Sequence, residues 1–196
     1  MSPTPEQEAT IYLDAQERQV WDALVAILVR LIWFTIVWLA GRKNPIHEGA
    51  HGIHGLDLLG RKVIMNGGAG LELLANTITQ TIDRAASNPA TAALADELRR
   101  RVERLVTVTM QVWSAGDVAV SLANATAYLE ATGHIVIAWM WLEQLLAVAD
   151  KTGDFYDGKR VAAQYFFTYE LPKVDAQFDL LAALDRTTLD ARPEIF

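Results

Sequence analysis

The amino-acid sequence predicts an all-α protein folded as a helical bundle. Apolar residues recur three or four positions apart along most of the chain, which is the spacing of one face of an α-helix. The sequence contains no run of alternating apolar and polar residues bounded by hairpin turns, the pattern expected of half-buried strands. Clusters of glycine, asparagine and proline separate the periodic stretches and divide the chain into successive helices.

The composition narrows the kinds of site that are possible. The chain has 196 residues, no cysteine and a formal net charge of -7. The lack of cysteine excludes disulfides, thiolate metal centres and cysteine nucleophiles, and the negative charge argues against a nucleic-acid partner. The arginines Arg99 to Arg101 and Arg104 are interleaved with Glu97 and Glu103, so we expect them to form a solvated helix face.

Residues 23–40 form an apolar stretch with a single charge, Arg30. Its length is at the lower limit for a membrane-spanning helix, and Trp33 and Trp38 suit an interfacial position. An arginine near the bilayer centre costs roughly 2.5–3.5 kcal/mol, which favours a helix buried in a bundle or in a subunit interface. Because the polar, acidic amino terminus differs from a secretory signal, we expect a cytoplasmic protein. Membrane association through residues 23–40 is the alternative.

The segment between Gly41 and Gly68 is rich in residues that end helices. Gly41 and Asn44-Pro45 are predicted to end the apolar helix. A glycine-dense turn follows, then a short helical stretch that ends near Gly60, and then a loop. The turn contains Gly49, Gly52 and Gly55, and the loop is Asn66-Gly67-Gly68.

Two amphipathic helices are predicted next, separated by a break at Ser87-Asn88-Pro89. The first carries apolar residues at helical spacing, namely Leu71, Leu74, Ile78 and Ile82. The second is expected from Thr91 to Trp113. Its buried stripe consists of Leu94, Leu98, Val102, Leu105 and Val106.

A further long helix is predicted from a cap at Asp117 to about Asp150. Its segment Ile135–Leu142, with the sequence IVIAWMWL, is apolar on every face. Such a segment is typical of the central helix of a bundle. We expect Trp139 and Trp141 to lie in the core.

The remaining predicted features lie on this helix and after it. His134 is expected to be buried and hydrogen-bonded to a neighbouring helix rather than to bind a metal. The last helix is predicted from Lys159, with Pro172 kinking or ending its first half. Tyr156, Lys159 and Tyr165 are candidates for a surface that meets further domains.

Residues 47–51 match the HExxH pattern of zinc proteases. That chemistry needs both histidines on one helical face, with the glutamate activating a zinc-bound water. Glu72 is a candidate third ligand. Pro45 and the three glycines that follow disfavour the required helix, each glycine by roughly 1 kcal/mol. We therefore predict no metal site, and a zinc hydrolase remains a distant alternative.

The longer segment NPIHEGAHGIHGLDLLGRKV, residues 44–63, resembles the acyl-CoA dehydrogenase family. In that family a similar E-G-containing run leads into an L-D-L-x-G-R-K sequence. The resemblance continues through residues 123–129, 133–142 and 155–172. These residues are similar to the extra helical domain at the carboxyl end of the long acyl-CoA dehydrogenases. The three blocks occur in the same order as in the family.

The resemblance implies a flavin-dependent α,β-dehydrogenation of an acyl-CoA thioester. Glu48 corresponds to the base that removes the α-proton, and a carboxylate enclosed with an acyl chain has a raised pKa suited to that role. Gly49, Ala50 and Gly52 correspond to the segment that helps hold FAD. The family has threonine where this chain has Ala50, so a hydroxyl donor is absent.

The resemblance also divides the chain. Residues 1–43 are an apolar leader helix without a match to the family, residues 44–86 a remnant of the dehydrogenase carboxyl-terminal helical domain, and residues 87–196 its helical extension domain. Because the flavin-enclosing domains of the family are absent, we expect the chain to be a fragment of the active enzyme. A homo-oligomer, or association through residues 23–40, is expected. The alternative is a non-enzymatic helical association module.

Overall fold

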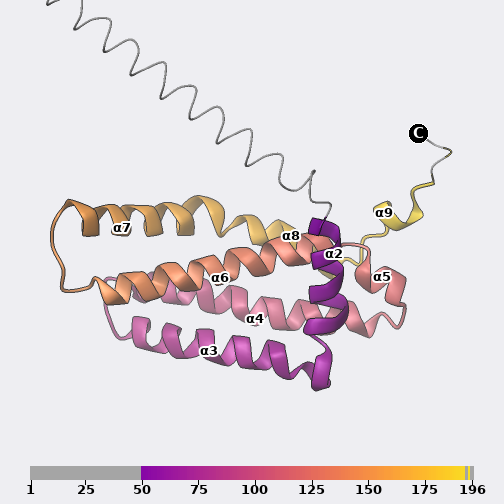
Figure 1. Cartoon of the computed structure of the whole chain (residues 1–196), viewed down its shortest axis with the longest axis horizontal. Coiled ribbons are helices and arrows are strands. Elements are labelled where there is room, and N and C mark those ends of the chain that lie inside the picture. Colours follow the sequence, from indigo (N-terminus) through magenta and orange to yellow (C-terminus); the bar gives the residue numbers. More distant parts are fainter. Residues whose placement is uncertain (1–49, 193, 195–196) are drawn as a thin grey trace, which may run out of the picture. The chain divides into compact units, whose positions relative to one another are not determined.

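The computed structural model describes residues 50–192 and residue 194. Every regular element in this part of the chain is a helix, which confirms the all-α class (Figure 1). The predicted leader helix 1–43 and the candidate base Glu48 lie outside the described residues. Helices α2 to α9 belong to one compact unit. The predicted boundary between residues 86 and 87, which separates the two parts of the chain that resemble different domains of the family, stays a prediction.

Four long helical elements run side by side in this unit (Figure 1). They are α3 (Ala69–Ala86), α4 (Ala92–Ser114), α6 (Ala125–Ala147), and a composite of α7 (Asp154–Tyr165), a π-turn (Phe166–Glu170) and α8 (Lys173–Ala182). Shorter elements connect and cover them. These are α2 (Ala50–Asp57), a π-turn (Leu58–Lys62), a 3₁₀ turn (Met65–Gly68), α5 (Val118–Leu122) and α9 (Thr187–Asp190).

The core lies between α3, α4, α6 and α8. Its largest fully buried side chains include Tyr128, Phe178, Ile78, Leu105 and Leu142. Removing each of these side chains from water contributes roughly 1.5–3 kcal/mol to the free energy of folding. On α3 the predicted helix is confirmed, with Ile78 and Ile82 buried and Leu71 and Leu74 half-buried. On α4 the middle of the predicted stripe is buried, whereas Leu94 and Val106 at its margins are half-buried.

Helix α6 packs against α2, α3, α4, α7 and α8, which confirms its central place. Its predicted start is wrong. Asp117 caps the short helix α5, where its carboxylate accepts a hydrogen bond of 2.9 Å from the backbone N–H of Ala119. Non-helical backbone at Asn124 then separates α5 from α6, and the Asn124 side chain donates to the carbonyl of Asp185. A contact 61 residues away therefore holds the break in place.

Two further expectations on polar residues are wrong. His134 is half-buried and bonds through Nδ1 to the carbonyl of Glu130 on its own helix, at 2.8 Å, and not to a neighbouring helix. Its ring stacks on Phe166, with 6.0 Å between ring centroids. Arg101 is buried rather than solvated, because it pairs with Asp175 of α8 at 2.8 Å.

The carboxyl-terminal helices begin earlier than predicted, at Asp154 instead of Lys159. The expected effect of Pro172 is confirmed, since α8 starts at Lys173 directly after it. Trp139 and Trp141 are only partly buried. The indole N–H of Trp139 donates to the Thr81 hydroxyl at 2.8 Å, linking α6 to α3.

Tyr128 makes folding sensitive to alkaline pH. Burial raises the pKa of its phenol from 10.0 to about 12, and its hydroxyl lies 2.6 Å from the Thr109 oxygen, which itself donates to the Leu105 carbonyl. The folded state therefore holds its proton where the unfolded chain has lost it, so this contribution to stability is complete below pH 10 and decreases above it. We expect a loss of about 2 kcal/mol by pH 12.

The measurement is urea unfolding at pH 8 to 12 for the wild type and for Tyr128→Phe, which cannot ionise. The variant should lose less stability than the wild type over the same range. Parallel pH curves for the two proteins would contradict the assignment.

Candidate functional site

The described part of the predicted site begins at helix α2. Ala50 is its first residue and Gly52 follows on an exposed face, while Glu48 and Gly49 lie outside the described residues. His51, in the first turn, has its Nε2 atom 3.3 Å from a carboxylate oxygen of Glu130 on α6. The other oxygen of Glu130 accepts a 2.9 Å hydrogen bond from Gln177 on α8. The start of α2 is thus connected to two helices of the bundle.

The predicted glycine-dense turn is helical from Ala50 onward, which corrects that expectation. Gly55 explains the difference, because it lies against the start of α6. A Cβ atom built on Gly55 would be 2.7 Å from the carbonyl oxygen of Ala125, closer than real contacts allow. The lack of a side chain lets the backbones of α2 and α6 approach, and the packing offsets the low helix propensity of glycine.

The arrangement gives no support to a metal centre in the part of the chain that is described. Within these residues no three histidine, aspartate or glutamate side chains gather closely enough to bind a metal ion. His54 is exposed, and Glu72 lines a groove on α3. His47 and Glu48 lie outside the described residues, so the zinc hydrolase stays a distant prediction.

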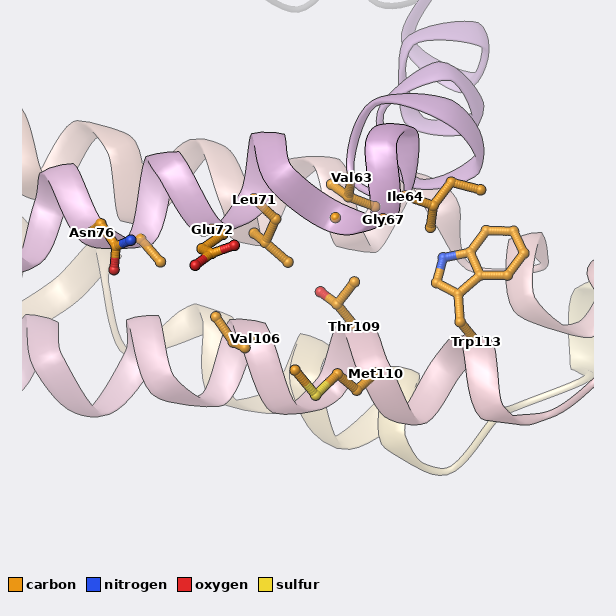
Figure 2. Close-up of a pocket in the computed structure, with 12 residues that line it drawn as sticks. Val63, Ile64, Gly67, Leu71, Glu72, Asn76, Val106, Thr109, Met110 and Trp113 are labelled. Atoms are coloured by element: carbon orange, nitrogen blue, oxygen red, sulfur yellow. The ribbon is translucent and has the colours of Figure 1, made fainter.

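The groove lies between α3 and α4 and has a volume of about 520 Å³ (Figure 2). This is within the usual range of ligand pockets. Its walls are mainly apolar. They are formed by Val63, Ile64, Gly67, Gly68, Leu71, Glu72, Ala75, Asn76, Val106, Thr109, Met110 and Trp113.

The polar groups of the groove lie along its length, with Thr109 near the middle (Figure 2). Glu72 and Asn76 stand toward one end and Trp113 at the other (Figure 2). The indole N–H of Trp113 is buried and has no hydrogen-bond acceptor among the described residues. Such a donor is costly unless an acceptor meets it. The mainly apolar walls suit an apolar group, and the buried indole N–H is not accessible from the groove.

A tight turn shapes the Trp113 end of this groove. Asn66, Gly67 and Gly68 have φ angles of 54°, 70° and 92°, in the left-handed region. Glycine adopts this region without steric cost, and asparagine tolerates it better than most residues. The loop predicted at this position is confirmed. The groove itself was not predicted, because Trp113 shows in sequence only as the end of a helix.

No helix within residues 50–192 combines the length and the apolar character that crossing a bilayer requires. The apolar stretch 23–40 was the predicted candidate and lies outside the described residues. The membrane alternative therefore stays a prediction.

Comparison with known proteins identifies the family. A family model described as "Acetyl-CoA dehydrogenase C-terminal like" matches residues 74–192, which is more than half of the chain. No curated protein matches the chain. The matched range runs from α3 to the residues just after α9 and so includes the four long elements of the bundle almost completely. The chain belongs to the acetyl-CoA dehydrogenase C-terminal-like family.

Proposed function

We propose that this protein is acyl-CoA dehydrogenase-like, with an FAD-dependent α,β-dehydrogenation of an acyl-CoA thioester as its family reaction. Family membership carries the proposal, together with the resemblance of residues 44–63 to the segment that bears the base in that family. The chain supplies the base-bearing segment and the helical extension of such an enzyme.

Glu48 is the proposed base. Its carboxylate takes the α-proton of the thioester while a hydride leaves the β-carbon, and a carbon–carbon double bond forms between the two carbons. When bound, FAD would supply the acceptor for that hydride. Removal of the proton by a positioned carboxylate contributes about 10²- to 10⁴-fold to such a reaction.

The described residues next to Glu48 are compatible with FAD at this position. A Cβ atom at Gly52 would meet nothing within 4 Å, which leaves room beside this turn. Ala50 offers no hydroxyl, so we propose that the backbone and not a side chain makes the contact there.

The test is retention of FAD by the purified full-length chain, followed by bleaching of the flavin when an acyl-CoA is added. We expect Glu48→Gln to keep the flavin and to slow its reduction at least 100-fold. His54→Gln alters an exposed side chain of the same segment and should leave the reduction unchanged. A colourless chain that takes up no added FAD would contradict the proposal and favour the association module, with membrane attachment through residues 23–40 as its variant.

A further inference from the structure

An exposed apolar ridge runs along α7 into the π-turn that follows it. Val161, Tyr165 and Tyr169 are 70%, 56% and 61% exposed. They are spaced four residues apart, so they lie in one row on the same helical face. The rings of Tyr165 and Tyr169 are in contact, with 4.9 Å between their centroids.

A shallow groove lies next to this ridge. Its floor is a second row of residues with the same spacing, Gly158, Ala162 and Phe166, and Trp141 of α6 contributes to its lining. The volume of the groove is about 640 Å³. A Cβ atom at Gly158 would meet nothing within 4 Å, so the small side chains of this row keep the groove open.

Most charged residues beside the ridge and groove have partners within the same copy, two of them in ion pairs and Lys159 on an aromatic ring. Arg160 pairs with Asp157 at 2.7 Å, and Lys173 pairs with Glu170 at 2.6 Å. The Lys159 ammonium lies over the Trp141 ring, 5.5 Å from its centroid. Two copies of a chain with a net charge of -7 repel each other overall, so a neutral surface is where they can approach.

We propose that a second copy of this chain packs on α7, with the ridge of each copy in the groove of the other. Rows of residues four apart on two helices interlock at a crossing angle near -50°, a common helix packing. A ridge and a groove side by side on one helix satisfy each other when a two-fold axis relates the copies. A different protein would need only the ridge or only the groove for docking, whereas a second copy uses both.

The size of the surface fits this assignment. Aromatic side chains bury 150–250 Å² each when covered, so roughly 100–150 Å² of each exposed ring is available here. Phe155 of α7 and Ile137, one turn before Trp141 on α6, are also exposed, and with them the ridge and the groove offer about 600 Å² per copy. This approaches the roughly 800 Å² per partner of a stable interface.

A single introduced cysteine tests the geometry, because the chain has no cysteine of its own. Val161→Cys places a thiol on the ridge, inside the proposed interface. Under mild oxidation of the full-length protein we expect a disulfide-linked dimer in non-reducing electrophoresis. Met110→Cys is the matched control, since Met110 is as exposed as Val161 but lies on α4 beside the other groove. It should cross-link at least tenfold more slowly.

The mass in solution gives an independent measurement. Light scattering after gel filtration should show a dimer for the wild type and for Leu73→Glu, a control at an exposed apolar position of α3. Tyr165→Glu should raise the dimer dissociation constant at least tenfold while the helical circular dichroism stays unchanged. A monomeric wild type would overturn the proposal. So would an oligomer that is insensitive to Tyr165→Glu and cross-links equally at both cysteines, because it would associate elsewhere, for example through residues 23–40.

Discussion

Gly55→Ala is expected to destabilise the bundle by about 3 kcal/mol, the upper end of the cost of overpacking a well-packed site. The added Cβ atom would lie 2.7 Å from the carbonyl oxygen and 2.8 Å from the carbonyl carbon of Ala125. Both are backbone atoms of α6, which cannot rotate away as the end of a flexible side chain can. Relief requires α2 to move off α6, and the buried Leu59 that follows α2 would lose packing.

Gly52→Ala is the matched control in the same helix. A Cβ atom there meets nothing within 4 Å, so only the helix propensity changes, and we expect a gain of about 0.5–1 kcal/mol. Urea unfolding followed by circular dichroism measures both variants. Equal and small effects of the two substitutions would show that α2 does not pack closely on α6.

The two glycines also show the limit of prediction for α2. Local propensity treats Gly52 and Gly55 alike and predicts a turn over both. The decisive fact is the position of the Ala125 carbonyl, which is 70 residues away in sequence and becomes known only when α6 is placed. Tertiary packing therefore overrides a propensity of roughly 1 kcal/mol per residue.

Where the signal is local, prediction from sequence succeeded. Helix α3 has regular apolar spacing and ends at Ala86, directly before Ser87-Asn88-Pro89, so its end was predicted to within a residue or two. The turn at Asn66-Gly67-Gly68 was found because left-handed backbone favours these residue types. The split between α5 and α6 was not found, because Asn124 is held by Asp185, a partner distant in sequence.

In the candidate site too, features with a local sequence signal were predicted and features that depend on distant residues were not. Glu48 and its neighbours were found through a continuous segment that resembles the family, and they stay a prediction. The groove between α3 and α4 exists only when the two helices are paired, so that Glu72 of α3 and Trp113 of α4 line the same cavity. No spacing within either helix indicates this, so a single sequence could not reveal the groove.

Arg101→Ala is expected to cost about 3 kcal/mol, although the sequence presents Arg101 as one of four similar arginines. Its side chain is buried, and its guanidinium pairs with Glu97 on its own helix and with Asp175 on α8. Removing one partner of a buried ion pair costs roughly 3–5 kcal/mol. The lower value applies here because both carboxylates remain partly exposed and can regain water.

Arg100→Ala is the control, because Arg100 is largely exposed and pairs only with Glu97 among the described residues. An exposed pair of this kind contributes less than about 1 kcal/mol. Arg101→Met separates charge from packing. It keeps most of the apolar contact of the side chain and should recover at least half of the loss. Similar destabilisation by the changes at residues 100 and 101 would contradict the buried position of Arg101.

Acid provides a second measurement on the same pair. The hydrogen bond from Arg101 lowers the pKa of the Glu97 carboxyl from its usual 4.5. A lowered pKa in the folded state stabilises the protein above pH 4.5, and this contribution is lost as the pH falls through the folded value. Below pH 4.5 the wild type should therefore lose more stability than Arg101→Ala, so the difference between them should shrink. A constant difference would mean that packing alone accounts for the effect of Arg101.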